Sequence, residues 1–365
     1  MRNYNYSADP FSINFNLMKI RYADYDDELT RSEFLNANDK INVFINLETA
    51  FKNLSMTPDI ETKLLLHKKY PIILTSNIIN LAAHYKRFFV SNGLDTHVYI
   101  YNTDLDSDKF NQRKYNPDYR SYYLIKYNQN PKFAALTEGL KTKILPEVKT
   151  LCDFIPGVYY ISAQNIAGSL VPYIVAKSDE SRKNLVISGD VLDSQMTFLD
   201  NFFATYLYRS VGIRKACSNI TEFLQVFTKK DENYCKELGN TYGYHGTYCS
   251  LMSVLGNRIR SIDGINGYGI QTLKRSINDG VSSNKIQITT DNPEMLSNIF
   301  NNEDDQLDFK ANYYCSSIPD MYNELTESEI LSVLNQREDR FDEQTLMRLN
   351  STTFYNYPLI LEALL

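Results

Sequence analysis

Short apolar runs alternate with longer segments of helical character along much of the 365-residue chain. We interpret the apolar runs as strands, at residues 41–47, 72–74, 97–101, 159–162 and 185–188, and we interpret residues 140–154 and 198–208 as helical. Strands that alternate with helices are typical of a sheet covered by helices. The pattern therefore predicts an α/β fold, in which a central parallel or mixed sheet is flanked by helices on both faces.

Polar residues stand where three of these apolar runs end. They are Asn46, Asn102 and Asp190. Functional residues of open α/β sheets gather at the carboxyl ends of the strands. Each of these three residues therefore stands where a site of such a sheet is expected.

Residues 251–279 have a different pattern, which reads as two short helices joined by a glycine hairpin. Gly264, Gly267 and Gly269 allow backbone conformations that a side chain would forbid. A helix beginning near residue 270 would present free amides and its positive end to a phosphate, with Lys274 and Arg275 one turn further along. Such contacts hold the nucleic-acid backbone without reading bases. The alternative is an ordinary helix-turn-helix connection with three turn glycines.

Charge is segregated along the chain, although the net charge is −6. Residues 109–149 carry nine basic and three acidic side chains, whereas residues 303–343 carry twelve acidic and three basic ones. This asymmetry favours a basic face for a polyanion, and the acidic stretch is by default a solvated face. In the basic stretch Arg113, Lys114 and Arg120 alternate with tyrosines. Basic residues mixed with aromatic rings suit the binding of a nucleic-acid strand, with contacts to its backbone and stacking on its bases. In the equally weighted alternative, the tyrosines are half-buried residues of a helix or strand.

The five cysteines form no Cys-x-x-Cys pair, and the four histidines form no recognisable catalytic or metal pattern. These features favour reduced thiols and argue against structural zinc. The sequence has neither an apolar run of membrane-spanning length nor a signal-peptide core at its start. We therefore expect a soluble protein without membrane association, in the cytoplasm or another reducing intracellular compartment.

Residues 255–269 read Leu-Gly-Asn-Arg-Ile-Arg-Ser-Ile-Asp-Gly-Ile-Asn-Gly-Tyr-Gly. This segment resembles the helix-hairpin-helix of the flap endonuclease and 5′-to-3′ exonuclease family, Leu-Gly-x-x-x-Asp-x-Ile-x-Gly-x-x-Gly-x-Gly. Weaker matches follow the family's order upstream, at the two strand ends, at the basic segment 110–122, at residues 161–176, and at residues 184–196, which resemble Ser-Gly-Asp-x-Asp-x-x-Gln. The resemblance implies a PIN-like 5′-nuclease domain at 41–290 with its helix-hairpin-helix at 251–279. A polar N-terminal extension (1–40) and an acidic, α-rich C-terminal extension (291–365) would flank it.

The family hydrolyses phosphodiesters with two magnesium ions, which need clustered carboxylate ligands. The resemblance places the family's carboxylate positions on neutral or basic residues, namely Asn46, Asn102, Asn165, Ala167, Gly168 and Arg260. Asp190 and Asp193 are retained. We hypothesise that Arg260 pairs with one of these aspartates in the electrostatic place of the lost cation. In the alternative interpretation Arg260 is solvated and misaligned.

The resemblance thus implies a pseudo-nuclease without a metal cofactor, acting as a DNA-binding or structural subunit of a larger nucleic-acid-processing assembly. We expect sequence-independent contact with the duplex DNA backbone, and a protein partner. The expected contacts are Gly264, Gly267, Gly269, Lys274 and Arg275, with a second contact from Arg113, Lys114 and Arg120.

Two alternatives stay open. One is an atypical magnesium-dependent 5′-exonuclease or flap endonuclease. Its shifted site would comprise Glu48, Asp104, Asp190 and Asp193, because Glu48 and Asp104 face the same side as the asparagines two residues earlier if the pleat continues. The other is a pure protein-interaction module.

Overall fold

A computed structural model describes residues 39–47, 70–103, 114–117, 138–153, 155–163, 166–188, 190–209, 212–217, 221, 225, 230–242, 244–257, 262–283 and 293–337. Its centre is a six-stranded sheet of order β3-β2-β1-β4-β5-β6. The strands are β1 (Lys40–Asn46), β2 (Asp95–Thr103), β3 (Val158–Ala163), β4 (Arg182–Ser188), β5 (Phe202–Arg209) and β6 (Gly212–Cys217). The first five are parallel and β6 is antiparallel to β5. The predicted mixed sheet is confirmed.

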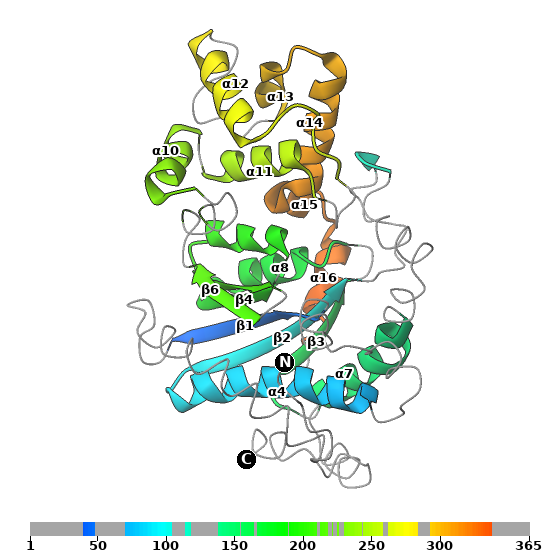
Figure 1. The fold of residues 1–365 in the computed structure, drawn as a ribbon. Coiled ribbons are helices and arrows are strands. Elements are labelled where there is room, and N and C mark those ends of the chain that lie inside the picture. The colour runs from blue at the N-terminus through cyan, green and yellow to red at the C-terminus, as the bar shows by residue number, and fades with distance from the viewer. Residues whose placement is uncertain are drawn as a thin grey trace, which may run out of the picture.

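Helices cover both faces of this sheet, as predicted (Figure 1). One face carries α4 (Tyr70–Ser91), the π-helix η2 (Leu140–Ile144) and α7 (Leu145–Cys152), and the other carries α8 (Leu170–Ser178) and α16 (Glu327–Leu334). Strand β1 lies at the centre, so Val43 and Phe44, which point to opposite faces, are both fully buried. Burial on both faces explains why the central strands contain apolar runs without polar alternation, such as residues 43–45 of β1.

The secondary structure predicted for two segments is wrong. Residues 72–74 belong to α4, in which the apolar pattern continues through Ile78, Ile79, Leu81 and Ala82 at helical spacing. Residues 202–209 form β5, where a run rich in aromatic residues fits a pleated surface better than a helix. A 3₁₀ helix, η3 (Val191–Phe198), precedes that strand. The helical character predicted from residue 140 is confirmed through Cys152.

A second layer of helices stands beyond α8, at the top of Figure 1. It comprises α10 (Glu232–Tyr242), α11 (Tyr244–Leu255), α12 (Ile270–Ser282), α13 (Pro293–Leu296), the 3₁₀ helix η5 (Ser297–Ile299), α14 (Glu303–Ser316) and α15 (Ile318–Asn323). One hydrophobic cluster joins Tyr248 and Met252 of α11 with Leu273 of α12 and Phe309 of α14. The helical layer therefore has a core of its own.

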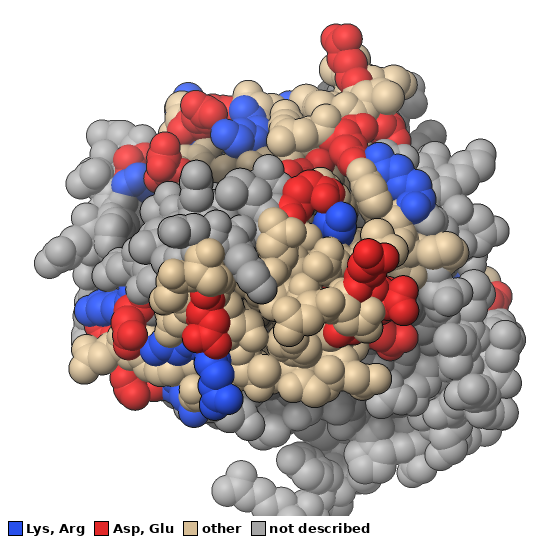
Figure 2. Space-filling view, turned by 90° about the horizontal axis from the view of Figure 1, so that it is seen from above, with Lys and Arg blue, Asp and Glu red and all other residues tan. Residues whose placement is uncertain are grey.

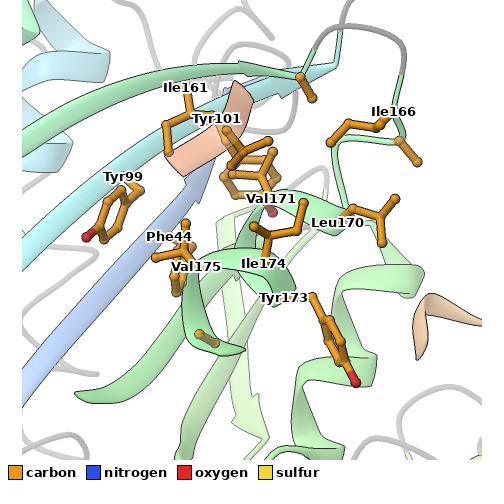
Figure 3. Close-up of a cluster of buried hydrophobic side chains, with 14 of the residues drawn as sticks. Phe44, Tyr99, Tyr101, Ile161, Ile166, Leu170, Val171, Tyr173, Ile174 and Val175 are labelled. Atoms are coloured by element: carbon orange, nitrogen blue, oxygen red, sulfur yellow. The ribbon is translucent and has the colours of Figure 1, made fainter. Parts of the chain in front are cut away.

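The sheet-side core lies between β1–β3 and α8 (Figure 3). Phe44, Tyr99 and Tyr101 of the sheet belong to the same cluster as Leu170 and Ile174 of α8. Residues Ile318, Met321 and Val333 of α15 and α16 belong to the same cluster. The chain after residue 290 thus packs into both cores, through α14 in the helical layer and through α15 and α16 beside the sheet.

A buried glutamine connects the two layers. In η3, the Gln195 Nε2 donates to the Ser316 carbonyl at 2.6 Å, and its Oε1 accepts from the Ile318 amide at 2.9 Å. Both backbone groups lie at the junction of α14 and α15, so their hydrogen-bonding capacity is satisfied inside the protein. In the parts of the chain that the structure describes, no helix has the length and apolar character needed to cross a membrane.

Candidate functional site

The carboxyl end of β1 lies beside a buried aspartate. Asn46 is paired in register with Tyr101 of β2. The Asn46 Nδ2 donates to the Asp193 Oδ2 at 3.3 Å, and the Tyr101 hydroxyl donates to the same oxygen at 2.6 Å. Asp193 is only 1% exposed. The site therefore contains a buried carboxylate oxygen that accepts hydrogen bonds from two neutral side chains.

The turn after β4 places this aspartate. The Asp190 amide donates to the Ser188 Oγ at 3.0 Å, and the Asp190 Oδ1 accepts from the Leu192 amide at 3.1 Å. Asp190 is therefore the N-cap of η3, a role that suits a short carboxylate side chain. Asp193 lies in the first turn of η3 and is carried beneath the ends of β1 and β2. The two retained aspartates therefore have different structural roles: Asp190 caps η3, and Asp193 is buried and accepts hydrogen bonds from the strands.

The environment keeps Tyr101 protonated. Burial, followed by the negative charges of Asp193 and Asp190, holds the pKa of the Tyr101 phenol well above its usual value near 10. A neutral phenol can donate, whereas a phenolate facing a carboxylate would be repelled. The short hydrogen bond to Asp193 is therefore stable across the physiological pH range.

Asn102 is not part of this group. Successive side chains of a strand point to opposite faces, so Asn102 lies on the face away from Tyr101 and Asn46. It is paired in register with Ser162 of β3 and is 4% exposed. Asn102 therefore lies on the face of the sheet opposite to Asp193, and Tyr101 is the residue of β2 that contacts Asp193. Strand parity relative to Asn46 is the signal that identifies Tyr101.

Other predicted positions of the nuclease site are either structural or outside the described residues. Ala167 and Gly168 are buried in the turn that starts α8, where their carbonyls accept from the amides of Leu170 and Val171. Asn165, Arg260, Glu48, Asp104, Arg113 and Arg120 lie outside the described residues. The proposed ion pair of Arg260 and the shifted metal site therefore stay predictions. Within the described ranges, no three His, Cys, Asp or Glu side chains are grouped as metal ligands.

The loop between α11 and α12 uses its glycines for different reasons. A Cβ on Gly264 would lie 2.7 Å from the Val254 carbonyl oxygen, and a Cβ on Gly256 would lie 2.5 Å from the Gly264 amide. These two glycines permit the loop to pack against the end of α11. Gly267 has a φ of +81°, which favours glycine, and a Cβ on Gly267 or Gly269 would meet nothing within 4 Å. The second half of the loop therefore faces open space.

Helix α14 fixes this loop from behind. The Asn312 Nδ2 donates to the carbonyls of Ser253 at 3.0 Å and Asp263 at 2.7 Å. The Ile265 amide also donates to the Val254 carbonyl at 2.9 Å. Because these bonds satisfy buried carbonyls at the end of α11, they hold the loop in one position. A residue from the acidic C-terminal part of the chain thus supports the glycine loop.

The structure separates the two basic residues predicted after the loop. Lys274 lies against α10, where its Nζ is 3.1 Å from the Glu237 Oε1 and 4.5 Å from the Tyr234 ring centroid. Its side chain is 19% exposed. Arg275 is exposed. Lys274 therefore joins two helices, and Arg275 is the residue available to solvent.

One end of the basic segment is anchored beside the loop. The Lys114 Nζ is 2.8 Å from the Glu324 Oε1, and the Tyr115 hydroxyl donates to the same oxygen. The Tyr115 ring stacks on Tyr314 with centroids 4.7 Å apart, and it also packs against the buried cluster of Ile262 and Cys315. Over the described part of the face in Figure 2, acidic and basic side chains are interspersed. A continuous basic surface is not visible there.

The chain is similar in structure to the flap endonuclease of bacteriophage T5, solved as a pseudo-enzyme–product complex with DNA and metal ions. The identity is 13%, the likeness covers 89% of this chain and 99% of that one, and the TM-score is 0.50. A structure of the T5 5′-exonuclease with bound zinc is 15% identical, with coverage of 81% and 100% and a TM-score of 0.49. No protein-family model and no curated protein matches the sequence. The structural likeness shows a 5′-nuclease-like fold.

Proposed function

We propose that this chain, whose fold is that of the 5′-nucleases, is a catalytically degenerate relative that binds the backbone of duplex DNA and does not hydrolyse it. The main support is the environment of Asp193. Its Oδ2 accepts from the Asn46 amide and the Tyr101 hydroxyl. Magnesium requires several anionic oxygen ligands in octahedral geometry, and N–H and O–H donors directed at the carboxylate compete with that role. Among the described residues, this donor set does not fit a two-metal centre.

The predicted helix-hairpin-helix at 251–279 is the proposed DNA contact. Helix α12 begins at Ile270, directly after the open part of the loop at Gly267 and Gly269. The start of a helix attracts phosphate through its amides and dipole, and two glycines leave room for close approach of a phosphate. Arg275 adds an exposed cation one turn later. The similar T5 flap endonuclease structure contains DNA, which agrees with this assignment.

A second contact would come from the basic segment around Lys114. Tyr115 packs against the cluster of Ile262 and Cys315, which includes the residue two positions before Gly264, so one end of this segment lies near the glycine loop. Lys114 is paired with Glu324, so a phosphate must compete with that carboxylate for it. We infer that the loop supplies most of the affinity. Contacts to the DNA backbone carry no sequence information. A protein partner within a nucleic-acid-processing assembly would add affinity and specificity to them.

The test is a fluorescence anisotropy titration of labelled duplexes with two unrelated sequences, at low and moderate salt. The proposal predicts similar affinity for both duplexes and a steep loss of affinity with salt, because each neutralised phosphate releases counterions. Absence of binding even at low ionic strength would make the loop a purely structural connection. The protein-interaction function would then be the better one.

A further inference from the structure

A polar pocket lies at the opposite end of the strands from Asp193. It has a volume of about 290 Å³, and its lining includes Asn42, His97, Tyr99, Asp179, Arg182 and Arg337. Asn42 and Asn46 are four residues apart on β1, which corresponds to roughly 13 Å along a strand. The pocket is therefore a separate site, bounded by the start of β4 and the ends of α8 and α16.

Asn42 presents a buried acceptor in this pocket. Its Nδ2 donates to the Asn184 Oδ1 at 3.0 Å, and the Asn184 Nδ2 in turn donates to the carbonyls of Arg182 and Asn201, both at 3.1 Å. This chain of bonds fixes which way each amide points. The Asn42 Oδ1 is then a buried acceptor to which no described residue donates. A buried acceptor of this kind needs a donor from a bound molecule or water.

The two arginines of the pocket differ in their charge balance. Arg182 is buried and paired with both Asp95 and Asp179, and it also donates to the Ile41 carbonyl. Arg337 donates from Nε to the Leu334 carbonyl and from Nη1 to the Ser178 Oγ, each at 3.2 Å. No carboxylate of the described residues lies within ion-pair distance of Arg337. Arg337 therefore brings to the pocket a guanidinium group that no carboxylate of the described residues pairs directly.

Tyrosine hydroxyls complete the lining. Phe44, Tyr99 and Tyr159 stack in a row across three strands, with successive centroids 5.1 Å and 5.2 Å apart. Tyr99 and Tyr159 both line the pocket, on the same face of the sheet as Phe44. Burial raises the pKa of Tyr99 despite the nearby arginines Arg337 and Arg182. The Tyr99 hydroxyl is therefore a neutral group. It lies 3.4 Å from the His97 Nδ1, and a bound anion would accept from it in place of that contact.

We propose that this pocket binds a small phosphate monoester that also carries a hydroxyl or amino group. The phosphate lies between Arg337 and the Tyr99 hydroxyl, since guanidinium groups bind phosphate through paired charge-assisted bonds. The hydroxyl or amino group donates to the Asn42 Oδ1. A neutral ligand would form no ion pair with Arg337. A bare anion such as inorganic phosphate would provide less than a phosphate monoester with a hydroxyl or amino group, because it has no such group to donate to the Asn42 Oδ1. The volume is near the lower end of the range of about 300–1,000 Å³ that ligand sites occupy, which suits a sugar phosphate.

The experiment is isothermal titration calorimetry of the full chain with ribose 5-phosphate, inorganic phosphate and ribose. We expect ribose 5-phosphate to bind, phosphate to bind more weakly, and ribose to give no measurable heat. Arg337→Gln should weaken ribose 5-phosphate binding by about tenfold or more, because it removes a charge-assisted contact. Arg87→Gln on α4, which covers the opposite face of the sheet, is the matched control and should leave affinity unchanged.

Tyr99→Phe is the second variant, because it removes only the hydroxyl and leaves the ring stack in place. It should weaken ribose 5-phosphate binding severalfold without changing the melting temperature much, so it keeps the test valid if Arg337→Gln fails to fold. Equal binding of ribose and ribose 5-phosphate, no heat with either, or unchanged affinity in both pocket variants would overturn the proposal. Competition by a 5′-phosphorylated oligonucleotide would identify a strand end as the source of the phosphate. Failure to compete would identify a free metabolite.

Discussion

The Tyr101 hydroxyl lies 2.6 Å from the Asp193 Oδ2, a hydrogen bond between the carboxyl end of a central strand and the 3₁₀ helix after β4. The same oxygen accepts from the Asn46 amide. A side chain that resembles a metal ligand in sequence thus helps to hold β1, β2 and η3 together. The contribution of the Asp193 hydrogen bonds can therefore be measured as a free energy of unfolding, without an assay of activity.

Tyr101→Phe should destabilise the fold by about 1–3 kcal/mol, because it removes the donor and leaves the buried Asp193 oxygen less well satisfied. The measurement is urea unfolding at neutral pH. Tyr322→Phe on α15 is the matched control and should stay within about 0.5 kcal/mol of the wild type. An equal loss of stability in both variants would mean that the hydrogen bond from Tyr101 to Asp193 contributes no more than the Tyr322 hydroxyl does.

The same variant should alter the alkaline limb of the stability profile. The folded-state pKa of Tyr101 is raised, so its contribution is present below the unfolded value near 10 and is lost as the pH rises above it. Between about pH 10 and 11.5, the wild type should therefore lose more stability than Tyr101→Phe. Unfolding curves at successive pH values check this. Parallel profiles for the two proteins would contradict the assigned shift.

Gly264 and Gly269 should respond in opposite ways to alanine. Gly264→Ala puts a Cβ 2.7 Å from a backbone carbonyl and should destabilise the fold by about 2 kcal/mol or more. Gly269→Ala meets nothing within 4 Å and should change stability by less than about 1 kcal/mol. It should nevertheless weaken duplex binding, because the methyl group occupies the space proposed for phosphate. Unaltered DNA affinity in a folded Gly269→Ala protein would remove the loop from the DNA interface.

Lys274 and Arg275 should also separate in their effects. Arg275→Ala should reduce the salt dependence of duplex binding by about one unit of the log–log slope and leave stability nearly unchanged. Lys274→Ala should cost about 1 kcal/mol of stability through its lost contacts with Tyr234 and Glu237, and it should change the slope little. Anisotropy titrations across salt concentrations and urea unfolding measure both. The reverse assignment would show that Lys274 leaves Glu237 to contact DNA.

The sheet was predictable from the sequence because its central strands are buried on both faces and contain short apolar runs, such as residues 43–45 and 185–187. The helix at residues 72–74 was missed because three apolar residues carry too little periodicity to separate a strand from a buried helix. Tyr101 was missed because strand register, Asn46 opposite Tyr101, decides which side chain faces Asp193. The role of Lys274 depends on α10, some forty residues earlier in the chain, and no local pattern indicates that contact.

The most direct test of the central claim is a cleavage assay combined with binding. A labelled flap duplex is incubated with the protein in magnesium and, separately, in manganese, while anisotropy confirms that the duplex is bound. Our account predicts bound and intact substrate in both metals, because Asp193 is engaged by Asn46 and Tyr101. Cleavage that disappears in Asp190→Ala or Asp193→Ala would contradict it and would establish an active metal-dependent nuclease.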